Sequence, residues 1–344
     1  MNILILGGTG AISREIVRQA IGCGHEVTIF NRGTQPPPSG ARVLAGDRHN
    51  AGDFAQKMAQ VDADVVIDMI CFRESDARQT VEAFAGRATQ LIFASSVAAY
   101  DRPCRSFPVR EVHERLRTDP AFQYGFQKAE MERFLQSEMG KTGTAITILR
   151  PSLTFGAGSA NFGILRQNRN VARRIAEGKP VVMTGEGAIP WSFTFTPDLA
   201  SAFVLACGNE KTYNDWFHVA NTEQTVWEEL YRAVGRAVGR EPVLYYVPSR
   251  LLMELDPQTC SHLYYEKVHF AFYSNEKFLK AAPGFAPKIS LDEGIRQLVD
   301  WWDASGFPYD PEKEQLEDGV CRLYEGFADG LTALRRQNEI HSQE

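Results

Sequence analysis

The first half of the chain alternates short, continuous apolar runs with helix-length segments. Runs that are apolar at nearly every position are typical of strands buried on both faces of a sheet. Helical segments such as Ser13–Gly22 and Arg78–Ala85 separate them. This alternation predicts βαβ units, and therefore an α/β fold built on a doubly wound parallel sheet. The predicted strands are Asn2–Leu6, Glu26–Phe30, Arg42–Leu44, Asp64–Met69, Gln90–Ala94 and Ala145–Leu149.

A glycine-rich turn follows the first predicted strand directly and opens a helix. Glycines at such a turn let the backbone approach a pyrophosphate, and the helix start supplies free N–H groups and a partial positive charge. An ordinary strand-to-helix turn is the alternative. Because the turn lies between a strand and a helix, as the fingerprint requires, it predicts a Rossmann-type dinucleotide site. The residues expected to bind the cofactor there are Gly7, Thr9, Gly10, Ala11 and Ile12.

The end of the second strand bears on the choice of cofactor. NAD sites usually place an acidic side chain here, and this chain has Asn31 followed by Arg32. The Arg32 guanidinium can pair with a 2′-phosphate and stack on adenine, so the sequence favours NADP, with NAD the alternative. A solvated loop arginine is the other interpretation of Arg32. Asp47 and Arg48, after the third strand, are further candidates at the adenine end, and Asp47 is equally suited to a turn.

A hydroxyl, a phenol and a lysine follow in the order that proton transfer at a carbinol needs. Ser95 and Ser96 follow the fifth strand, and Tyr124 and Lys128 share one face of a predicted helix. Tyrosine, with a pKa of about 10, is a poor base at neutral pH unless a nearby cation stabilises its phenolate. A serine hydroxyl can then hold the substrate oxygen beside the tyrosine. The alternative for Tyr124 and Lys128 is an amphipathic helix with a snorkelling lysine.

These motifs together resemble the extended short-chain dehydrogenase/reductases, the NAD-dependent epimerase/dehydratase superfamily. The Gly-Gly-Thr-Gly turn with Phe-Asn-Arg-Gly after the second strand resembles the branch that contains the chloroplast stem-loop-binding proteins. The resemblance covers about residues 1–305 and includes Leu-Arg-Pro at 149–151 and Phe-Thr-Pro-Asp-Leu-Ala at 195–200. It implies Ser96 as the catalytic hydroxyl, Tyr124 as the acid/base, and Lys128 as the group that binds the nicotinamide ribose and tunes Tyr124. We also expect Pro151 beside the cofactor.

Two departures from the family pattern narrow the chemistry. The 4,6-dehydratases carry Asp-Glu after the catalytic hydroxyl, and this chain has Val97 and Ala98 there, so elimination is disfavoured. In nucleotide-sugar members an arginine clamps the diphosphate, and Trp191 occupies the matching position. Trp191 could stack on a sugar, or it could be a core aromatic. Ser95 is a candidate neighbour of the substrate. Arg166, on a basic helical stretch predicted at Gly163–Gly178, is a candidate anion contact, although a solvated helix face is the alternative.

Length and charge set the organisation and the partners. A chain of 344 residues allows two domains. We expect residues 1–155, with returning elements at about 185–225, to form the dinucleotide-binding domain, and residues 156–184 and 226–344 to form a smaller α/β substrate-binding lobe. A net charge of −6 disfavours nucleic acid as a partner. The sequence holds no run of about 18 apolar residues, so we expect no membrane span. Six scattered cysteines without C-x-x-C predict reduced thiols in a cytoplasmic protein, and the histidine spacing predicts no metal site.

The sequence therefore predicts an enzyme that moves hydride between a nicotinamide and a secondary alcohol of a sugar-like, polyhydroxylated substrate. An epimerase, which oxidises the carbinol, lets the ketone rotate and reduces it again, is the favoured form. A ketoreductase or dehydrogenase that releases its product is the alternative, and a non-catalytic RNA-binding or redox-sensing relative is the alternative from another class. The resemblance also implies a homodimer that forms through the helix carrying Tyr124 and Lys128.

Overall fold

The computed structural model describes residues 1–159, 162–165, 168–307 and 309–341. By their internal contacts these residues divide into two compact units. Unit 1 comprises residues 1–159, 190–225 and 269–294, and unit 2 comprises residues 160–189, 226–268 and 295–344. Among the described residues, no helix combines the length and the apolarity that a membrane crossing needs.

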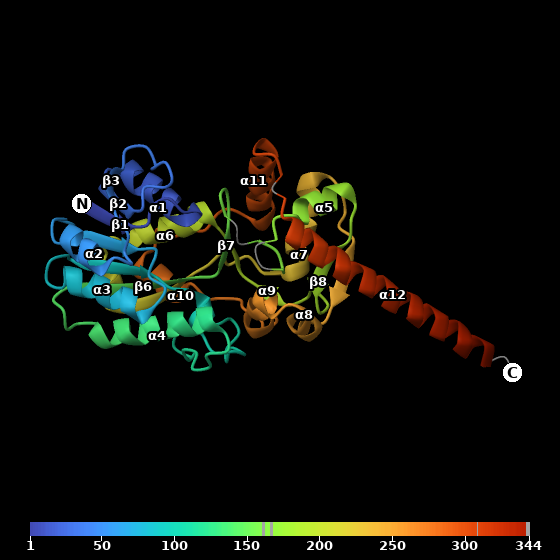
Figure 1. Cartoon of the computed structure of the whole chain (residues 1–344). Helices are drawn as coiled ribbons and strands as arrows, with labels where there is room; N and C mark the ends of the chain where they lie inside the picture. Colours follow the sequence, from blue (N-terminus) through green and yellow to red (C-terminus); the bar gives the residue numbers. More distant parts are fainter. Residues whose placement is uncertain (160–161, 166–167, 308, 342–344) are drawn as a thin grey trace. The chain divides into compact units, whose positions relative to one another are not determined.

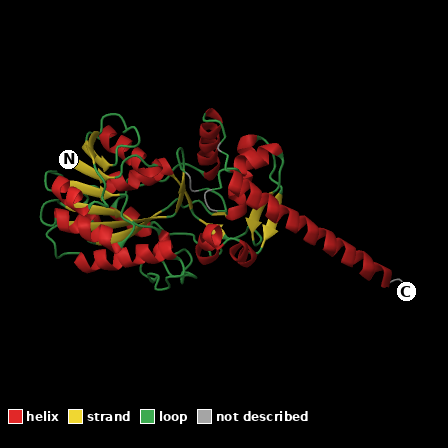
Figure 2. Ribbon diagram, viewed as in Figure 1, coloured by secondary structure: helices red, strands yellow, loops and turns green. Residues whose placement is uncertain are grey.

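Unit 1 is built on a sheet of strands, which Figure 2 draws in yellow. The sheet has seven strands, every strand pair is parallel, and the order is β11-β6-β5-β4-β1-β2-β3. The strand order reverses between β1 and β4, which makes this a doubly wound, Rossmann-type sheet, as predicted. The predicted strands match the observed ones to within one or two residues. The strands are β1 (Asn2–Leu6), β2 (Glu26–Asn31), β3 (Arg42–Ala45), β4 (Val65–Asp68), β5 (Gln90–Ala94), β6 (Ala145–Pro151) and β11 (Asp215–Val219).

Helices cover both faces of this sheet (Figure 1). Helices α1 (Ala11–Gly22), α6 (Thr196–Ala206) and α10 (Glu276–Ala281) share one buried apolar cluster with the strands. Helices α2 (Ala51–Met58), α3 (Glu74–Phe84) and α4 (Gln123–Glu138) share the other. The central strands are therefore apolar on both faces, and each fully buried Ile, Val or Phe stabilises the fold by about 1.5–3 kcal/mol.

Short elements complete unit 1. A 3₁₀ turn, η1 (Val97–Ala99), follows β5, and a second, η2 (Glu210–Thr212), precedes β11. The short strands β7 (Leu153–Phe155) and β10 (Phe193–Phe195) pair in parallel, and β9 (Pro190–Trp191) and β12 (Thr225–Val226) are two residues each.

Residues 269–294 differ from the predicted division, which placed them in the substrate lobe. They belong to unit 1 because specific contacts tie them there: Ser192 N donates to Ala271 O, and the Asn275 side chain bonds the backbone of Ala220. Phe278 also packs edge-on against Phe217 of β11. Residues 185–189, predicted as returning elements, lie in unit 2.

Unit 2 mixes helices with one parallel pair of strands, β8 (Val181–Thr184) and β13 (Leu244–Val247). Its helices are α5 (Val171–Glu177), α7 (Trp227–Val238), α8 (Ser249–Leu255), α9 (Pro257–His262) and α12 (Pro311–His341), with a π-helical turn, η3, at Leu263–Lys267. Helix α11 (Leu291–Ala304) spans the division at residue 294.

The helix predicted at Gly163–Gly178 is shorter in the structure. Gly163 has φ +81°, and the Tyr231 hydroxyl accepts a hydrogen bond from Ile164 N. The Asn168 side chain accepts from Asn170 N and donates to Glu317. The two tertiary bonds and this local turn replace helical bonds, so the helix begins only at Val171.

Candidate functional site

The turn after β1 requires glycine at Gly7 and Gly8. Gly7 and Gly8 have φ values of +114° and +92°, in the region that favours glycine. A Cβ on Gly8 would lie 2.5 Å from Ile29 Cγ2, inside the core. Gly7 N donates to Phe30 O over 2.8 Å, which holds the turn against the end of β2. The bare backbone can therefore lie directly against a ligand, as a dinucleotide requires.

The start of α1 also fits an anionic ligand. Ser13, where the fingerprint usually has a third glycine, is buried, and its hydroxyl accepts a hydrogen bond from Gly10 N over 3.1 Å. First-turn N–H groups, here including those of Ala11 and Ile12, have no place in the helix's own ladder, and they carry the positive end of its dipole. Thr9 lies half-buried in the same turn.

Of the residues predicted at the adenine end, Asn31 and Asp47 hydrogen-bond the backbone of nearby turns, whereas Arg32 is exposed. Asn31 braces the turn, because its amide donates to Gly7 O and accepts from Gly33 N. Arg32 is exposed beside it, which leaves its guanidinium accessible to a ligand. The Asp47 carboxylate accepts from His49 N over 3.0 Å, the bond of an ordinary turn.

Arg48 does not suit the cofactor role predicted for it. Its guanidinium is buried and lies 2.9 Å from one carboxylate oxygen of Asp68 and 3.1 Å from the other. It also donates to Asp76 O and to the Thr80 hydroxyl. Every one of these partners is within the fold, so Arg48 anchors α3 to the end of β4 and is left out of the proposed site.

Lys128 is the most strongly constrained residue of the predicted catalytic set. Its side chain is buried, and Nζ donates to Cys71 O over 2.7 Å and to Ala94 O over 2.6 Å. The ammonium therefore lies where β4 and β5 end, with the Phe72 ring 4.9 Å away. Burial lowers the pKa of Lys128, while Asp68 and Glu132 nearby favour its charged form. Two of the three N–H donors are used by these carbonyls, which leaves the third for a ligand.

Ser96 and Tyr124 lie on segments that pack together. Helix α4 carries Tyr124 and Lys128 one turn apart, and Gly125 at its start is so close to η1 that a Cβ would lie 2.4 Å from Ala98 O. Ser96 immediately precedes η1, and its half-buried hydroxyl accepts from Ala98 N. The Tyr124 side chain is 40% exposed, so its phenol can meet a ligand from solvent.

Ser95 and Trp191, two of the predicted substrate contacts, are buried within the protein. Ser95 is buried and donates to the Glu132 carboxylate, so its hydroxyl faces the protein interior instead of a substrate. Trp191 is 1% exposed with the Arg102 guanidinium 5.9 Å from its ring centre, which makes it a core aromatic that cannot stack on a sugar as it stands. Arg166 lies outside the described residues. Pro151 is the last residue of β6, where it is buried and paired with Val219.

Sequence reasoning missed the residues behind this set. Glu132 is fully buried, and the Arg150 guanidinium binds its carboxylate. A charged residue inside the apolar sixth strand is the signal that could have found Arg150. The spacing of four residues from Lys128 to Glu132 is the signal for Glu132, because it places both on one helix face.

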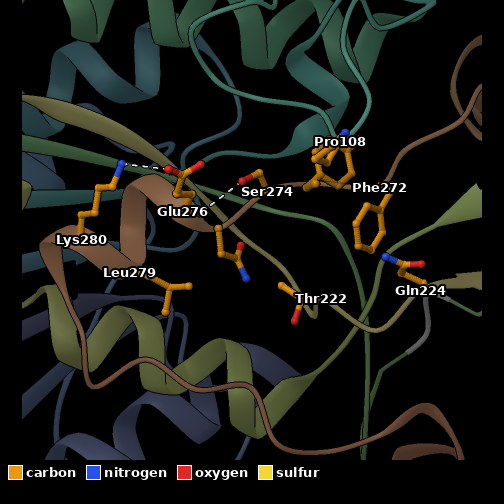
Figure 3. A pocket seen from close by; sticks show the side chains of 10 residues that line it. Pro108, Thr222, Gln224, Phe272, Ser274, Glu276, Leu279 and Lys280 are labelled. Carbon is orange, nitrogen blue, oxygen red and sulfur yellow. Dashed lines mark hydrogen bonds and ion pairs between the residues drawn. The ribbon is translucent and has the colours of Figure 1, made fainter.

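One hollow in unit 1 is separate from the predicted site residues (Figure 3). It lies beyond the carboxyl end of β11, and an ion pair between Glu276 and Lys280 borders it. None of the predicted site residues lines it. No group of His, Cys, Asp and Glu in the described parts of the chain could hold a metal ion. The lining residues are Pro108, Thr222, Gln224, Phe272, Tyr273, Ser274, Asn275, Glu276, Leu279 and Lys280.

The sequence profile of the NAD-dependent epimerase/dehydratase family matches residues 3–216, more than half of the chain. The chain belongs to this family. The matched region spans the glycine turn, Ser96, Tyr124 and Lys128, and it ends within β11. Membership makes the chain a relative of NAD(P)-dependent oxidoreductases and epimerases, and the glycine turn and Lys128 fit that class of cofactor.

Curated relatives with related sequences differ in what their names say they do. The 2′-dehydrokanamycin reductase of Streptomyces kanamyceticus is 26% identical over 242 residues, which cover 70% of this chain and 67% of that protein. A chloroplast stem-loop binding protein of Arabidopsis thaliana is 27% identical over 313 residues, 85% of this chain and 77% of that protein. The second relative agrees with the branch that the sequence resembles.

Solved structures share the fold. The UDP-glucose 4-epimerase of Thermotoga maritima, solved with UDP-glucose, superposes with a TM-score of 0.69 at 20% identity, covering 89% of this chain and 99% of that one. The UDP-glucose 4-epimerase of Thermus thermophilus, solved with NAD, gives 0.70 at 20% identity, covering 89% and 100%. At such identities the likeness establishes the α/β architecture and no substrate.

Proposed function

We propose that this protein is an NAD(P)-dependent enzyme that transfers hydride at a secondary alcohol or ketone of a sugar-like substrate. The observation that carries the proposal is the placement of Lys128. Its ammonium is fixed by two carbonyls at the carboxyl ends of β4 and β5, one helical turn from Tyr124. This is the sheet edge at which doubly wound folds bind their ligands, close to where the strand order reverses.

The chain's own residues would divide the work as follows. A bound nicotinamide supplies or accepts the hydride. Tyr124 takes the carbinol proton during oxidation and returns it during reduction, and the Lys128 ammonium stabilises the phenolate form of Tyr124. The Ser96 hydroxyl holds the substrate oxygen beside the phenol. The turn from Gly7 to Ile12 receives the pyrophosphate against its backbone.

The cofactor proposed is NADP, with NAD the alternative. Arg32 is exposed next to the glycine turn, and Asn31 lacks the carboxylate that would repel a 2′-phosphate. Arg32→Ala should therefore weaken NADPH binding about tenfold and leave NADH binding within about twofold, measured by nucleotide fluorescence, since a charge-assisted bond contributes about 1.5 kcal/mol or more. Arg42→Ala, an exposed arginine paired with Glu26, is the control. An equal loss for both nucleotides would sink the NADP preference.

Two outcomes of hydride transfer compete, and two assays with different substrates separate them. The sequence favours an epimerase, whereas the relative named 2′-dehydrokanamycin reductase favours a ketoreductase. Trp191 at the position of the diphosphate-clamping arginine supports a substrate without a nucleotide diphosphate. With 2′-dehydrokanamycin as the probe, a reductase consumes NADPH stoichiometrically. With UDP-glucose, an epimerase forms the 4-epimer without net change in nicotinamide absorbance.

The catalytic assignment is tested at Tyr124. Tyr124→Phe removes the proton donor and keeps the ring, so turnover should fall by about 10²–10⁴. Tyr213→Phe is the matched control. Tyr213 is a half-buried residue of unit 1 that lies just before the amino end of β11, whereas the proposed site lies at the carboxyl ends of the strands. Turnover that survives in Tyr124→Phe would refute the assignment. The homodimer, the cytoplasmic location and the assignment of substrate specificity to the lobe stay predictions.

A further inference from the structure

A buried polar chain runs beneath the proposed catalytic residues of unit 1. The Ser95 hydroxyl donates to Glu132 Oε1, and Arg150 Nε lies 2.9 Å from each oxygen of the same carboxylate. Arg150 Nη1 donates to the Tyr100 hydroxyl over 2.7 Å, and that hydroxyl lies 2.6 Å from His218 Nε2. All five side chains are buried, so no solvent competes for these bonds.

The hydrogen bonds of the chain permit one consistent direction. Tyr100 accepts from Arg150, so its own proton faces His218 Nε2, and His218 Nδ1–H then donates to Ser274 O, 3.2 Å away. Burial raises the pKa of Tyr100 and holds the pKa of His218 well below its ordinary value, so both side chains stay neutral. A chain of satisfied bonds in a low dielectric is rigid, because a break at any point leaves a buried polar group without a partner.

The chain attaches directly to both halves of the catalytic set. Ser95 immediately precedes Ser96, and Glu132 follows Lys128 by one turn and Tyr124 by two turns on α4. The bond from Ser95 to Glu132 thus joins the segment that carries Ser96 to the helix that carries Tyr124. Arg150 in turn fixes Glu132 to the central sheet through β6.

We propose that Ser95 and Glu132 are positioning residues that set the spacing between the Ser96 hydroxyl and the Tyr124 phenol. The proposal rests on the proposed function, because it concerns the geometry of the same catalytic set. A misplacement of about 1 Å can lower the rate of a reaction about 10²-fold, whereas binding of the substrate and the cofactor changes less. The loss on breaking the link should therefore appear in kcat.

Ser95→Ala breaks the link without isolating a buried charge, since Glu132 keeps its pairing with Arg150. Ser137→Ala is the matched control: Ser137 is exposed on the same helix, and its hydroxyl donates to Phe134 O over 2.7 Å. With 2′-dehydrokanamycin and NADPH, or with UDP-glucose, we expect kcat of Ser95→Ala to fall at least tenfold. KM and the Kd for NADPH should stay within about twofold of wild type. Ser137→Ala should match wild type in all three.

A second readout does not depend on turnover. Amide hydrogen exchange at residues 96–100 should become faster in Ser95→Ala and stay unchanged in Ser137→Ala, because only the former frees that segment from α4. Unchanged exchange, or a wild-type kcat, would overturn the positioning role. A parallel loss of NADPH affinity and melting temperature would also overturn it, since that is the signature of general destabilisation. Failure of the proposed function is recognised separately, by turnover that survives in Tyr124→Phe.

Discussion

Substitution of Gly8 by alanine should lower the free energy of unfolding for two reasons, one in the backbone and one in the packing around the new Cβ. The first is the backbone: φ is +92°, and an L-residue in the left-handed region costs about 1–2 kcal/mol. The second is overlap, because the new Cβ would lie 2.5 Å from Ile29 Cγ2 and 2.7 Å from Ile29 Cβ. Forcing extra volume into a packed core costs about 1–3 kcal/mol, so the total is about 2–5 kcal/mol.

Gly24→Ala is the control that isolates the overlap. Gly24 has φ +82°, close to that of Gly8, and nothing lies within 4 Å of its added Cβ. Both variants change the unfolded chain alike, so the difference in their free energies of unfolding reports the clash with Ile29. Urea titration of both variants measures it, and NADPH affinity should fall only for Gly8→Ala. Equal free energies of unfolding for the two variants would refute the reasoning that the turn is packed against the core.

Two further predictions concern the free energy of unfolding. Arg174→Met should cost about 3–5 kcal/mol in urea titrations because it leaves the buried Glu317 carboxylate without its cation, whereas Arg173→Met, at a half-exposed pair, should cost less than about 1 kcal/mol. Burial holds the pKa of His218 well below its ordinary value. Below about pH 6.5 the His218 imidazole is therefore protonated in the unfolded chain while it stays neutral in the folded chain. Stability should consequently fall as the pH drops from 7 to 5, by at most about 1.4 kcal/mol per unit for this group, and His218→Gln should flatten the fall. An unchanged slope in that variant would contradict the role of His218.

The strands of unit 1 could be predicted from the sequence because their environment is simple. A strand buried on both faces needs apolar residues throughout, and β1 and β5 begin and end at the predicted residues. The sequence also predicted that the glycine turn joins β1 to α1 and that Tyr124 and Lys128 share one helix, because these expectations depend on spacings of only a few residues. The helix predicted at Gly163–Gly178 failed because bonds to Tyr231 and Glu317, distant in sequence, compete with helical ones.

The candidate site was predicted less completely for the same reason. Arg48 and Ser95 were expected to contact a ligand. In the structure they bind Asp68 and Glu132 instead, which are 20 and 37 residues away in the sequence. A buried polar side chain bonds to a partner that the fold brings close to it, and the residues next to it in the sequence do not predict which partner that is. Tyr100 and His218, 118 residues apart, illustrate the limit.

The sheet of unit 1 is completed late in the order of synthesis. Strand β11, which pairs with β6, begins 64 residues after β6 ends. Helix α6, whose apolar side chains share a cluster with α1, ends nine residues before β11 begins. A nascent or truncated chain that stops near residue 160 therefore exposes the full edge of β6, and it leaves the sheet face that α6 and α10 pack on covered by α1 alone. Such edges pair readily with other chains. A fragment that keeps the whole of unit 1 therefore needs residues 190–225 and 269–294 as well as residues 1–159, and cutting the chain after its last apparent motif would leave the unit incomplete.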